Sequence, residues 1–153
     1  MKIDFFKYQG TGNDFVILDN RDNKYNGLTV KQIKHICDRR FGIGADGLMM
    51  LASKAGYDFE MIYHNADGNQ SSMCGNGGRC TVAFAHQLGA IEGNCQFLAV
   101  DGPHHALIKN PEWVELKMID VTHVEEGSDF YFLNTGSPHY IAFVEEVGNI
   151  DVV

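Results

Sequence analysis

The sequence is poor in proline, in tryptophan and in positive charge. Its 153 residues include three prolines, one tryptophan and twelve Lys and Arg against twenty Asp and Glu, so the formal net charge is -8. A negative chain repels phosphate backbones and anionic lipids, and we therefore expect neither nucleic-acid binding nor membrane association. No apolar run approaches the roughly 20 residues of a membrane-spanning helix, and the first residues do not resemble a secretory signal. A cytoplasmic protein is expected.

Closely spaced cysteine pairs are also absent. The four cysteines are Cys37, Cys74, Cys80 and Cys95. Without a secretory signal, these thiols are expected to be free, and their spacing lacks the close pairs that zinc sites use. His104 and His105 are adjacent, so in a strand they would face opposite sides of the sheet. We expect no metal site, and all of the cysteines except Cys74 are interpreted as core residues.

The composition is that of a compact folded chain. Hydrophobic residues make up 44% of the sequence and charged residues only 21%, which excludes a disordered chain. One domain or two small ones are expected. Seventeen glycines predict many short strands joined by tight turns. The expected strands are residues 3–8, 15–19, 48–52, 57–63, 96–100, 106–108, 113–118, 130–134 and 140–145.

Two helices are predicted. Thr29 and Gln32 form a capping box at the start of an amphipathic surface helix, whose apolar stripe stops before Gly42. The second helix is expected at 79–88, ending before Gly89. Because apolar or small side chains lie on nearly every face of this second helix, we expect it to be buried among the strands.

The densest group of chemically useful residues lies at 65–80. Cys74 stands immediately before the second helix, and a helix N-terminus stabilises a thiolate and attracts a substrate carboxylate. Gly75, Gly77 and Gly78 are expected to let the backbone approach a ligand and adopt conformations that side chains forbid. We predict a reactive thiol at Cys74, against the alternative of a small buried core residue.

Two asparagines, Asn65 and Asn76, flank Cys74 in this segment. Asparagine is a poor core former but orients polar ligands well, because its amide both donates and accepts hydrogen bonds. Both residues are therefore candidate ligand-binding residues.

Two further clusters carry polar residues at turns. The segment G-T-G-N-D-F at 10–15 is either a hairpin turn or, through Asn13, part of a ligand site; it is not a dinucleotide motif, since a strand follows it. The segment N-T-G-S-P-H-Y at 134–140 places His139 beside a turn that is set by proline. His139 is either a surface histidine or a group that handles protons.

These motifs resemble the diaminopimelate epimerase family, whose members interconvert LL- and meso-diaminopimelate on the route to lysine. The motifs are G-T-G-N-D-F at 10–15, R-R-F-G-I-G-A-D-G-L at 39–48, N-A-D-G at 65–68, M-C-G-N-G-G-R-C at 73–80 and N-T-G-S-P-H at 134–139. Their order and their spread over nearly the whole chain make the resemblance specific.

The resemblance implies an α+β fold in which antiparallel or mixed strands wrap around a central buried helix. It also implies two similar domains with the active site in the cleft between them. Residues 1–120 would form the first domain and residues 121–153 the beginning of a second, truncated one.

The resemblance further implies a mechanism with two bases and no cofactor, in which one cysteine removes the α proton and another thiol delivers a proton to the opposite face. The catalytic residues implied are Cys74 and His139, the latter tuning the thiols. The substrate-binding residues implied are Asn13, Asn65, Gly75 and Asn76. No metal and no cofactor are expected.

Some features of the family are missing from the sequence. Gly47 stands where many relatives carry glutamine, and Ser137 where many carry asparagine. No second cysteine motif and no glutamate-arginine pair appears before Val153. We therefore expect a truncated chain that carries one of the two catalytic cysteines.

Three alternatives remain open from the sequence. The chain could be an isomerase similar to proline or hydroxyproline racemases, a carboxylate- or phosphate-binding module without turnover, or an inactive fragment. The expected partners are an amino-acid substrate and, at most, a second copy of the chain in a homodimer.

Overall fold

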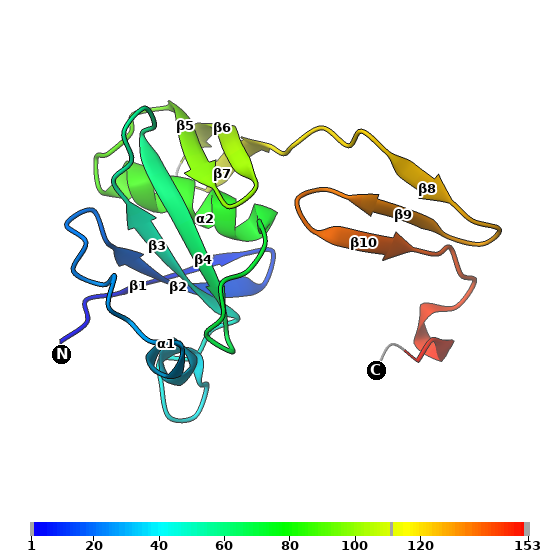
Figure 1. Cartoon of the computed structure of the whole chain (residues 1–153), viewed down its shortest axis with the longest axis horizontal. Coiled ribbons are helices and arrows are strands. Elements are labelled where there is room, and N and C mark those ends of the chain that lie inside the picture. The colour runs from blue at the N-terminus through cyan, green and yellow to red at the C-terminus, as the bar shows by residue number, and fades with distance from the viewer. Residues whose placement is uncertain (1, 111, 152–153) are drawn as a thin grey trace. The chain divides into compact units, whose positions relative to one another are not determined.

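The computed structural model describes residues 2–110 and 112–151. The chain forms two compact units, Met1–Met118 and Ile119–Val153 (Figure 1). Whether the second unit begins a domain with the fold of the first stays a prediction. No helix in the described part of the chain is long and apolar enough to cross a membrane.

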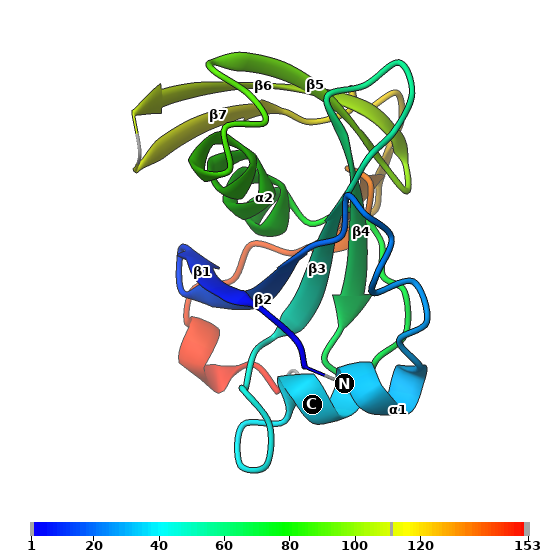
Figure 2. The same cartoon turned by 90° about the vertical axis from the view of Figure 1, so that its left-hand side faces the viewer.

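The first unit is built on a mixed seven-stranded sheet whose strands are hydrogen-bonded in chain order. The strands are β1 (Phe6–Gly10), β2 (Asn13–Asp19), β3 (Gly47–Ala52), β4 (Phe59–Asn65), β5 (Asn94–Ala99), β6 (Gly102–Asn110) and β7 (Trp113–Lys117). Two neighbouring pairs, β2 with β3 and β4 with β5, are parallel, and the other four pairs are antiparallel. The sheet curls around the helix α2 (Gly75–Gln87), which confirms the expected α+β fold (Figure 2).

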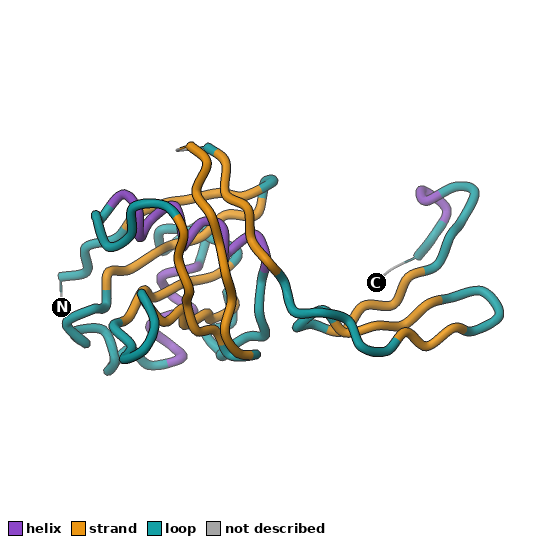
Figure 3. Tube along the Cα trace, turned by 90° about the horizontal axis from the view of Figure 1, so that it is seen from above, coloured by secondary structure: helices purple, strands orange, loops and turns teal. Residues whose placement is uncertain are grey.

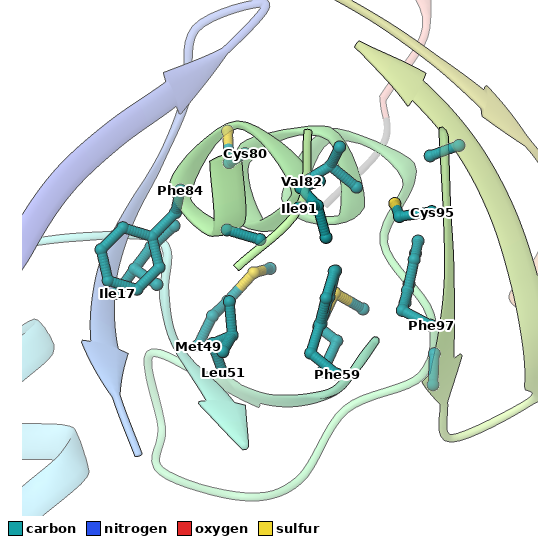
Figure 4. Packing of buried hydrophobic residues seen from close by; sticks show 14 of the residues in the cluster. Ile17, Met49, Leu51, Phe59, Cys80, Val82, Phe84, Ile91, Cys95 and Phe97 are labelled. Carbon is teal, nitrogen blue, oxygen red and sulfur yellow. The ribbon is translucent and has the colours of Figure 1, made fainter. Parts of the chain in front are cut away.

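The central strands are buried on both faces. In β2, Phe15 and Ile17 pack in the cluster around α2, whereas Val16 and Leu18 pack in a second cluster with the helix α1 (Val30–Cys37). Because successive side chains of a strand point to opposite faces, one strand supplies both cores. Helix α1 lies on the outer side of the sheet, and its Thr29–Gln32 capping box is present as predicted (Figure 2). Figure 4 shows how Met49, Leu51 and Phe59 meet α2.

Helix α2 begins four residues earlier than the predicted start at 79, because its first turn contains glycines that a propensity argument places outside a helix. A Cβ added at Gly77 would lie 1.7 Å from Met49 Cε, and one added at Gly78 would lie 2.9 Å from Leu116 Cδ2. Neither glycine has a positive φ. The expectation that these glycines adopt special backbone conformations is therefore wrong; they are small so that α2 can lie close to the sheet.

The largest correction among the strands concerns β6, expected at 106–108 and observed at Gly102–Asn110. Its first residues, Gly102 to His105, contain no apolar alternation, so the sequence pattern does not mark them as a strand. The remaining strands of the first unit shift by up to three residues at their ends.

The second unit is a three-stranded antiparallel meander (Figure 3). It comprises β8 (Val124–Glu126), β9 (Tyr131–Asn134), β10 (Pro138–Ile141) and the short 3-10 helix η1 (Val147–Asn149). Strand β8 was not predicted. Strand β10 overlaps the strand expected at 140–145 but begins and ends earlier, at Pro138 and Ile141. Within this unit, Phe130 stacks on Tyr140 with ring centroids 4.9 Å apart.

Candidate active site

Cys74 is the N-cap residue of α2, with extended backbone angles. Its side chain is half-buried, and the backbone N–H of Gly77 donates a hydrogen bond to Sγ at 3.5 Å. On another side, the thiol donates to Oδ1 of Asn13 at 3.8 Å. Sulfur takes the place that a serine or threonine oxygen usually fills at a helix start. The thiol thus lies at the positive end of α2, as predicted, between one donor and one acceptor.

The other three cysteines differ from Cys74 in burial. Cys37, Cys80 and Cys95 are buried in the two hydrophobic clusters. Burial raises the pKa of each of these thiols to about 11, because a thiolate loses its hydration in an apolar surrounding. Their predicted role as core residues is confirmed.

The sheet brings two of the candidate asparagines to the helix-facing side. Gly47 of β3 pairs with Phe15 of β2 and with Asn65 of β4. Phe15 points toward α2, so Gly47 and Asn65 share that face, and Asn13, two residues before Phe15, shares it too. This polar end of the sheet faces the start of α2, since Asn13 contacts Cys74 directly. The side chain of Asn65 is exposed there.

The remaining substrate-binding candidates lie in the first turn of α2. The side chain of Asn76 accepts a hydrogen bond from Thr11 Oγ1 at 3.0 Å and another from the guanidinium of Arg79. It is therefore held against the β1–β2 turn. A Cβ added at Gly75 would meet nothing closer than Met118 Sδ at 3.6 Å, so packing does not require glycine at this position.

A charged cluster, which the sequence analysis did not identify, contacts Asn13 on the side away from Cys74. Arg39 donates to Asp14 Oδ1 at 2.7 Å and to Asp46 Oδ1 at 2.8 Å, and Lys7 pairs with Asp14 Oδ2 at 2.7 Å. The hydrogen bonds from Arg39, and then the charge and hydrogen bond of Lys7, hold the pKa of Asp14 well below its usual value. Asp46 Oδ2 accepts from the side-chain amide of Asn13. Arg39 and Asp46 belong to the motif at 39–48, but the motif by itself assigns them no role.

Gly47 and Tyr63 form a second feature that the sequence did not reveal. A Cβ at Gly47 would lie 2.5 Å from Tyr63 Cε2 and 2.6 Å from the carbonyl oxygen of His64. The Tyr63 ring therefore fills the space that a side chain at position 47 would need. Burial, followed by the nearby Cys74 and Asp46, raises the pKa of Tyr63 to about 12. The phenol is thus protonated and stands next to the candidate thiol.

His139 lies in the second unit. Its Nδ1 is 2.8 Å from the carbonyl oxygen of Ser137 and 3.4 Å from Thr135 Oγ1, and its side chain is exposed. These contacts are local to the turn between β9 and β10. A role for His139 beside Cys74 stays a prediction.

A cleft of about 760 Å³ lies over α2, between the edge strands β1 and β7. It is lined by Tyr8, Gln9, Gly10, Thr11, Arg79, Cys80, Ala83, Glu112, Trp113 and Val114. Cys74 does not line this cleft. The cleft therefore adjoins the candidate site at Gly10 and Thr11 without containing its thiol. No group of three or more metal-ligating side chains occurs among residues 2–110 and 112–151.

The chain has the α+β fold of the diaminopimelate epimerase and PhzF-like class. A PhzF-family phenazine biosynthesis protein of Bacillus anthracis superposes with a TM-score of 0.68 at 16% identity, covering 93% of this chain and 56% of that one. A hydroxyproline epimerase from Agrobacterium vitis superposes with a TM-score of 0.66 at 13% identity, covering 95% and 53%. At these identities the likeness shows the fold alone.

The particular family follows from the sequence. The diaminopimelate epimerase family matches residues 5–124. The diaminopimelate epimerase of Flavobacterium psychrophilum is 50% identical over 147 residues, covering 96% of this chain and 57% of the relative. That of Chlorobaculum tepidum is 42% identical over 151 residues, covering 94% and 58%. The chain belongs to the diaminopimelate epimerase family, and it spans less than two thirds of the length of these relatives.

Proposed function

We propose that this chain supplies one of the two acid–base groups of a cofactor-independent epimerase that interconverts LL- and meso-diaminopimelate in cytoplasmic lysine biosynthesis. The group is Cys74. The observation that supports this proposal most strongly is the half-buried thiol at the N-cap of α2, with the N–H of Gly77 3.5 Å from its sulfur. Membership of the family supports the same activity.

Epimerisation without a cofactor needs two opposed groups. One must take a proton from one face of the α carbon, and the other must give a proton to the opposite face, because a single base returns the proton to the face from which it came. Cys37, Cys80 and Cys95 are buried in the core, so none of them serves as the second group. In this proposal, the acid–base group on the opposite face of the α carbon comes from a segment other than residues 2–151. His139 would tune the thiols.

The substrate's charged groups meet the start of α2 in this proposal. The N–H groups of Gly77 and Gly78 are engaged by the sulfur and the carbonyl of Cys74. Those of Gly75 and Asn76 are the other two in this first turn, where helical N–H groups have no partner in a preceding turn. They would bind the α carboxylate and stabilise the negative charge that develops when the α carbon loses its proton. Asn13 and Asn65 would orient the amino group from the facing sheet.

The test measures exchange of the α hydrogen. The chain is combined with the remaining C-terminal part of the Flavobacterium psychrophilum relative, and loss of the α-proton signal of LL-diaminopimelate in deuterated water is followed by NMR. Because proton transfer by a positioned side chain contributes about 10²–10⁴ in rate, Cys74→Ser should reduce exchange by at least about 100-fold. Cys37→Ala, which removes a thiol buried beside α1, should leave the rate within about twofold. Equal exchange in Cys74→Ser and the parent would refute the proposal.

A substrate panel separates the alternatives. Exchange of L-proline or trans-4-hydroxy-L-proline in place of diaminopimelate would indicate a racemase of the related kind. Binding of diaminopimelate with no exchange of any amino acid would indicate a binding module.

A further inference from the structure

The side-chain amide of Asn13 has a defined orientation in this site. Its Nδ2 group donates to Asp46 Oδ2, and its Oδ1 faces the thiol of Cys74 at 3.8 Å. An ionised carboxylate only accepts hydrogen bonds, so the end of the amide that faces Asp46 must be the NH₂ group. The carbonyl end is thereby left for Cys74. The contact with Asp46 thus decides which end of Asn13 the sulfur meets.

Asp46 is itself held in place. Arg39 donates to its Oδ1 at 2.8 Å, and the backbone N–H of Asp14 donates to its Oδ2 at 3.1 Å. Its own backbone N–H donates to the carbonyl oxygen of Asp14 at 3.0 Å. The carboxylate therefore lies in one position, with one oxygen for Arg39 and the other for Asn13.

The end of Asn13 that meets Cys74 matters for the charge on sulfur. A carbonyl oxygen can accept a hydrogen bond from a thiol but repels a thiolate, whereas an NH₂ group would stabilise the thiolate. The N–H of Gly77, on the other side of the sulfur, favours the thiolate. The sulfur thus lies between a group that favours the protonated form and one that favours the deprotonated form. Such a balance suits a group that must both hold and release a proton.

We propose that Asp46 is a positioning residue: held by Arg39, it fixes the amide of Asn13 so that its carbonyl, and not its NH₂ group, faces the thiol of Cys74 and accepts its hydrogen bond. The inference rests on the proposed proton-transfer role of Cys74. It adds to that role a residue which does not touch the sulfur and which acts only through Asn13.

Other ionisable side chains lie near Cys74, and a test of Asp46 must leave these residues unsubstituted. Tyr63 of β4 and Cys80 of α2 both interact electrostatically with it. Arg79 of α2 is bonded to Asn76, two residues after Cys74. A substitution at Asp46 leaves these side chains in the chain and removes only the smaller contribution of the Asp46 charge to the raised pKa of Tyr63.

The substitution Asp46→Asn reverses the orientation. Arg39 would bind the carbonyl of the new amide, so its NH₂ group would replace Oδ2. That group would lose the hydrogen bond from the backbone N–H of Asp14 and would require the carbonyl of Asn13 as acceptor. The NH₂ group of Asn13 would then face Cys74. A donor in place of an acceptor changes the balance by about the worth of one hydrogen bond, so the thiolate fraction at pH 7 should rise about threefold to tenfold.

The measurement is the rate at which iodoacetamide alkylates Cys74 in the chain as it stands, followed on the Cys74 peptide by mass spectrometry. The rate at pH 7 is divided by the plateau rate at alkaline pH, where all of the sulfur is thiolate, so changes in access to the sulfur cancel. This ratio should rise about threefold to tenfold in Asp46→Asn. Asp14→Asn is the matched control, because it removes the same charge from the other carboxylate that Arg39 binds, but its side chain does not touch the Asn13 amide. Its ratio should change less than twofold.

A double mutant tests whether the effect passes through Asn13. In an Asn13→Ala background, Asp46→Asn should leave the ratio unchanged within the error of the measurement. An unchanged ratio in Asp46→Asn alone, or an equal rise in the Asn13→Ala background, would overturn the proposal. Either result would leave the exchange test of Cys74 untouched, because alkylation requires no turnover. Circular dichroism confirms that each variant is folded.

Discussion

The backbone N–H of Gly77 points at the sulfur of Cys74 from 3.5 Å, so the first turn of α2 donates a hydrogen bond to the side chain of its own N-cap. Gly77 is also the residue that lies against Met49 of the sheet. One residue therefore both seats the helix on β3 and polarises the thiol. The position of the sulfur is fixed by the packing of α2 and not by a flexible loop.

Selective alkylation follows from the different burial of the four cysteines. At pH 8, thiols whose pKa lies at about 11 are thiolate in only about one molecule in a thousand. Iodoacetamide should therefore modify half-buried Cys74 first, and Cys37, Cys80 and Cys95 only after unfolding. Peptide mass spectrometry after short labelling measures this order. Labelling of all four cysteines at similar rates in the folded chain would contradict the site as described.

Substitution at Gly47 should reduce stability. An added Cβ would lie 2.5 Å from the Tyr63 ring and 2.6 Å from a backbone carbonyl oxygen that cannot move without disturbing β4. Gly47→Ala should therefore lower the free energy of unfolding by about 1–3 kcal/mol. Gly93→Ala is the control, since nothing lies within 4 Å of its added Cβ. Denaturant unfolding of both variants gives the comparison, and equal stabilities would show that the Tyr63 ring does not occupy this space.

Local signals made part of the fold predictable. Alternation marked β7, and the Thr29–Gln32 capping box marked α1, because both patterns depend only on neighbours in the sequence. The start of α2 was missed because Gly77 and Gly78 are helical for a tertiary reason, contact with Met49 and Leu116. The position of Cys74 at the start of α2 was predicted from its place before the helix, and its reactivity stays a prediction. The support from Arg39, Asp46 and Tyr63 was not, since it depends on contacts between strands distant in sequence.

Acid should destabilise the first unit through Asp14. Its folded-state pKa lies below the unfolded value of about 3.9, so the carboxylate contributes stability above that pH and loses it as pH falls through the folded pKa. Asp14→Asn removes the titration. The difference in stability between variant and parent should therefore be largest near pH 6 and shrink as pH falls below about 4. Thermal unfolding from pH 6 to pH 2.5 measures it, and a constant difference over that range would contradict the prediction.

The last prediction concerns His104 and Asp101, a buried pair outside the candidate site. His104 Nε2 lies 2.9 Å from Asp101 Oδ1, and Nδ1 lies 3.1 Å from the carbonyl oxygen of Lys117, so both ring nitrogens face acceptors. The ring also stacks on Phe97. Asp101 Oδ2 is buried and has no hydrogen-bond partner among the described residues, so Asp101 depends on its single contact with His104.

His104→Phe preserves the stacking on Phe97 but removes the ring nitrogens that lie against the Lys117 carbonyl oxygen and the Asp101 carboxylate. Leaving buried acceptors unpaired costs about 1–3 kcal/mol, so the free energy of unfolding should fall by about that amount. Adding Asp101→Leu should recover part of the loss, because it removes one of the stranded groups. His105→Phe, at the exposed neighbouring position, is the control and should change stability by less than about 0.5 kcal/mol. If His104→Phe is as stable as this control, the pair does not connect the β5–β6 turn to the end of β7.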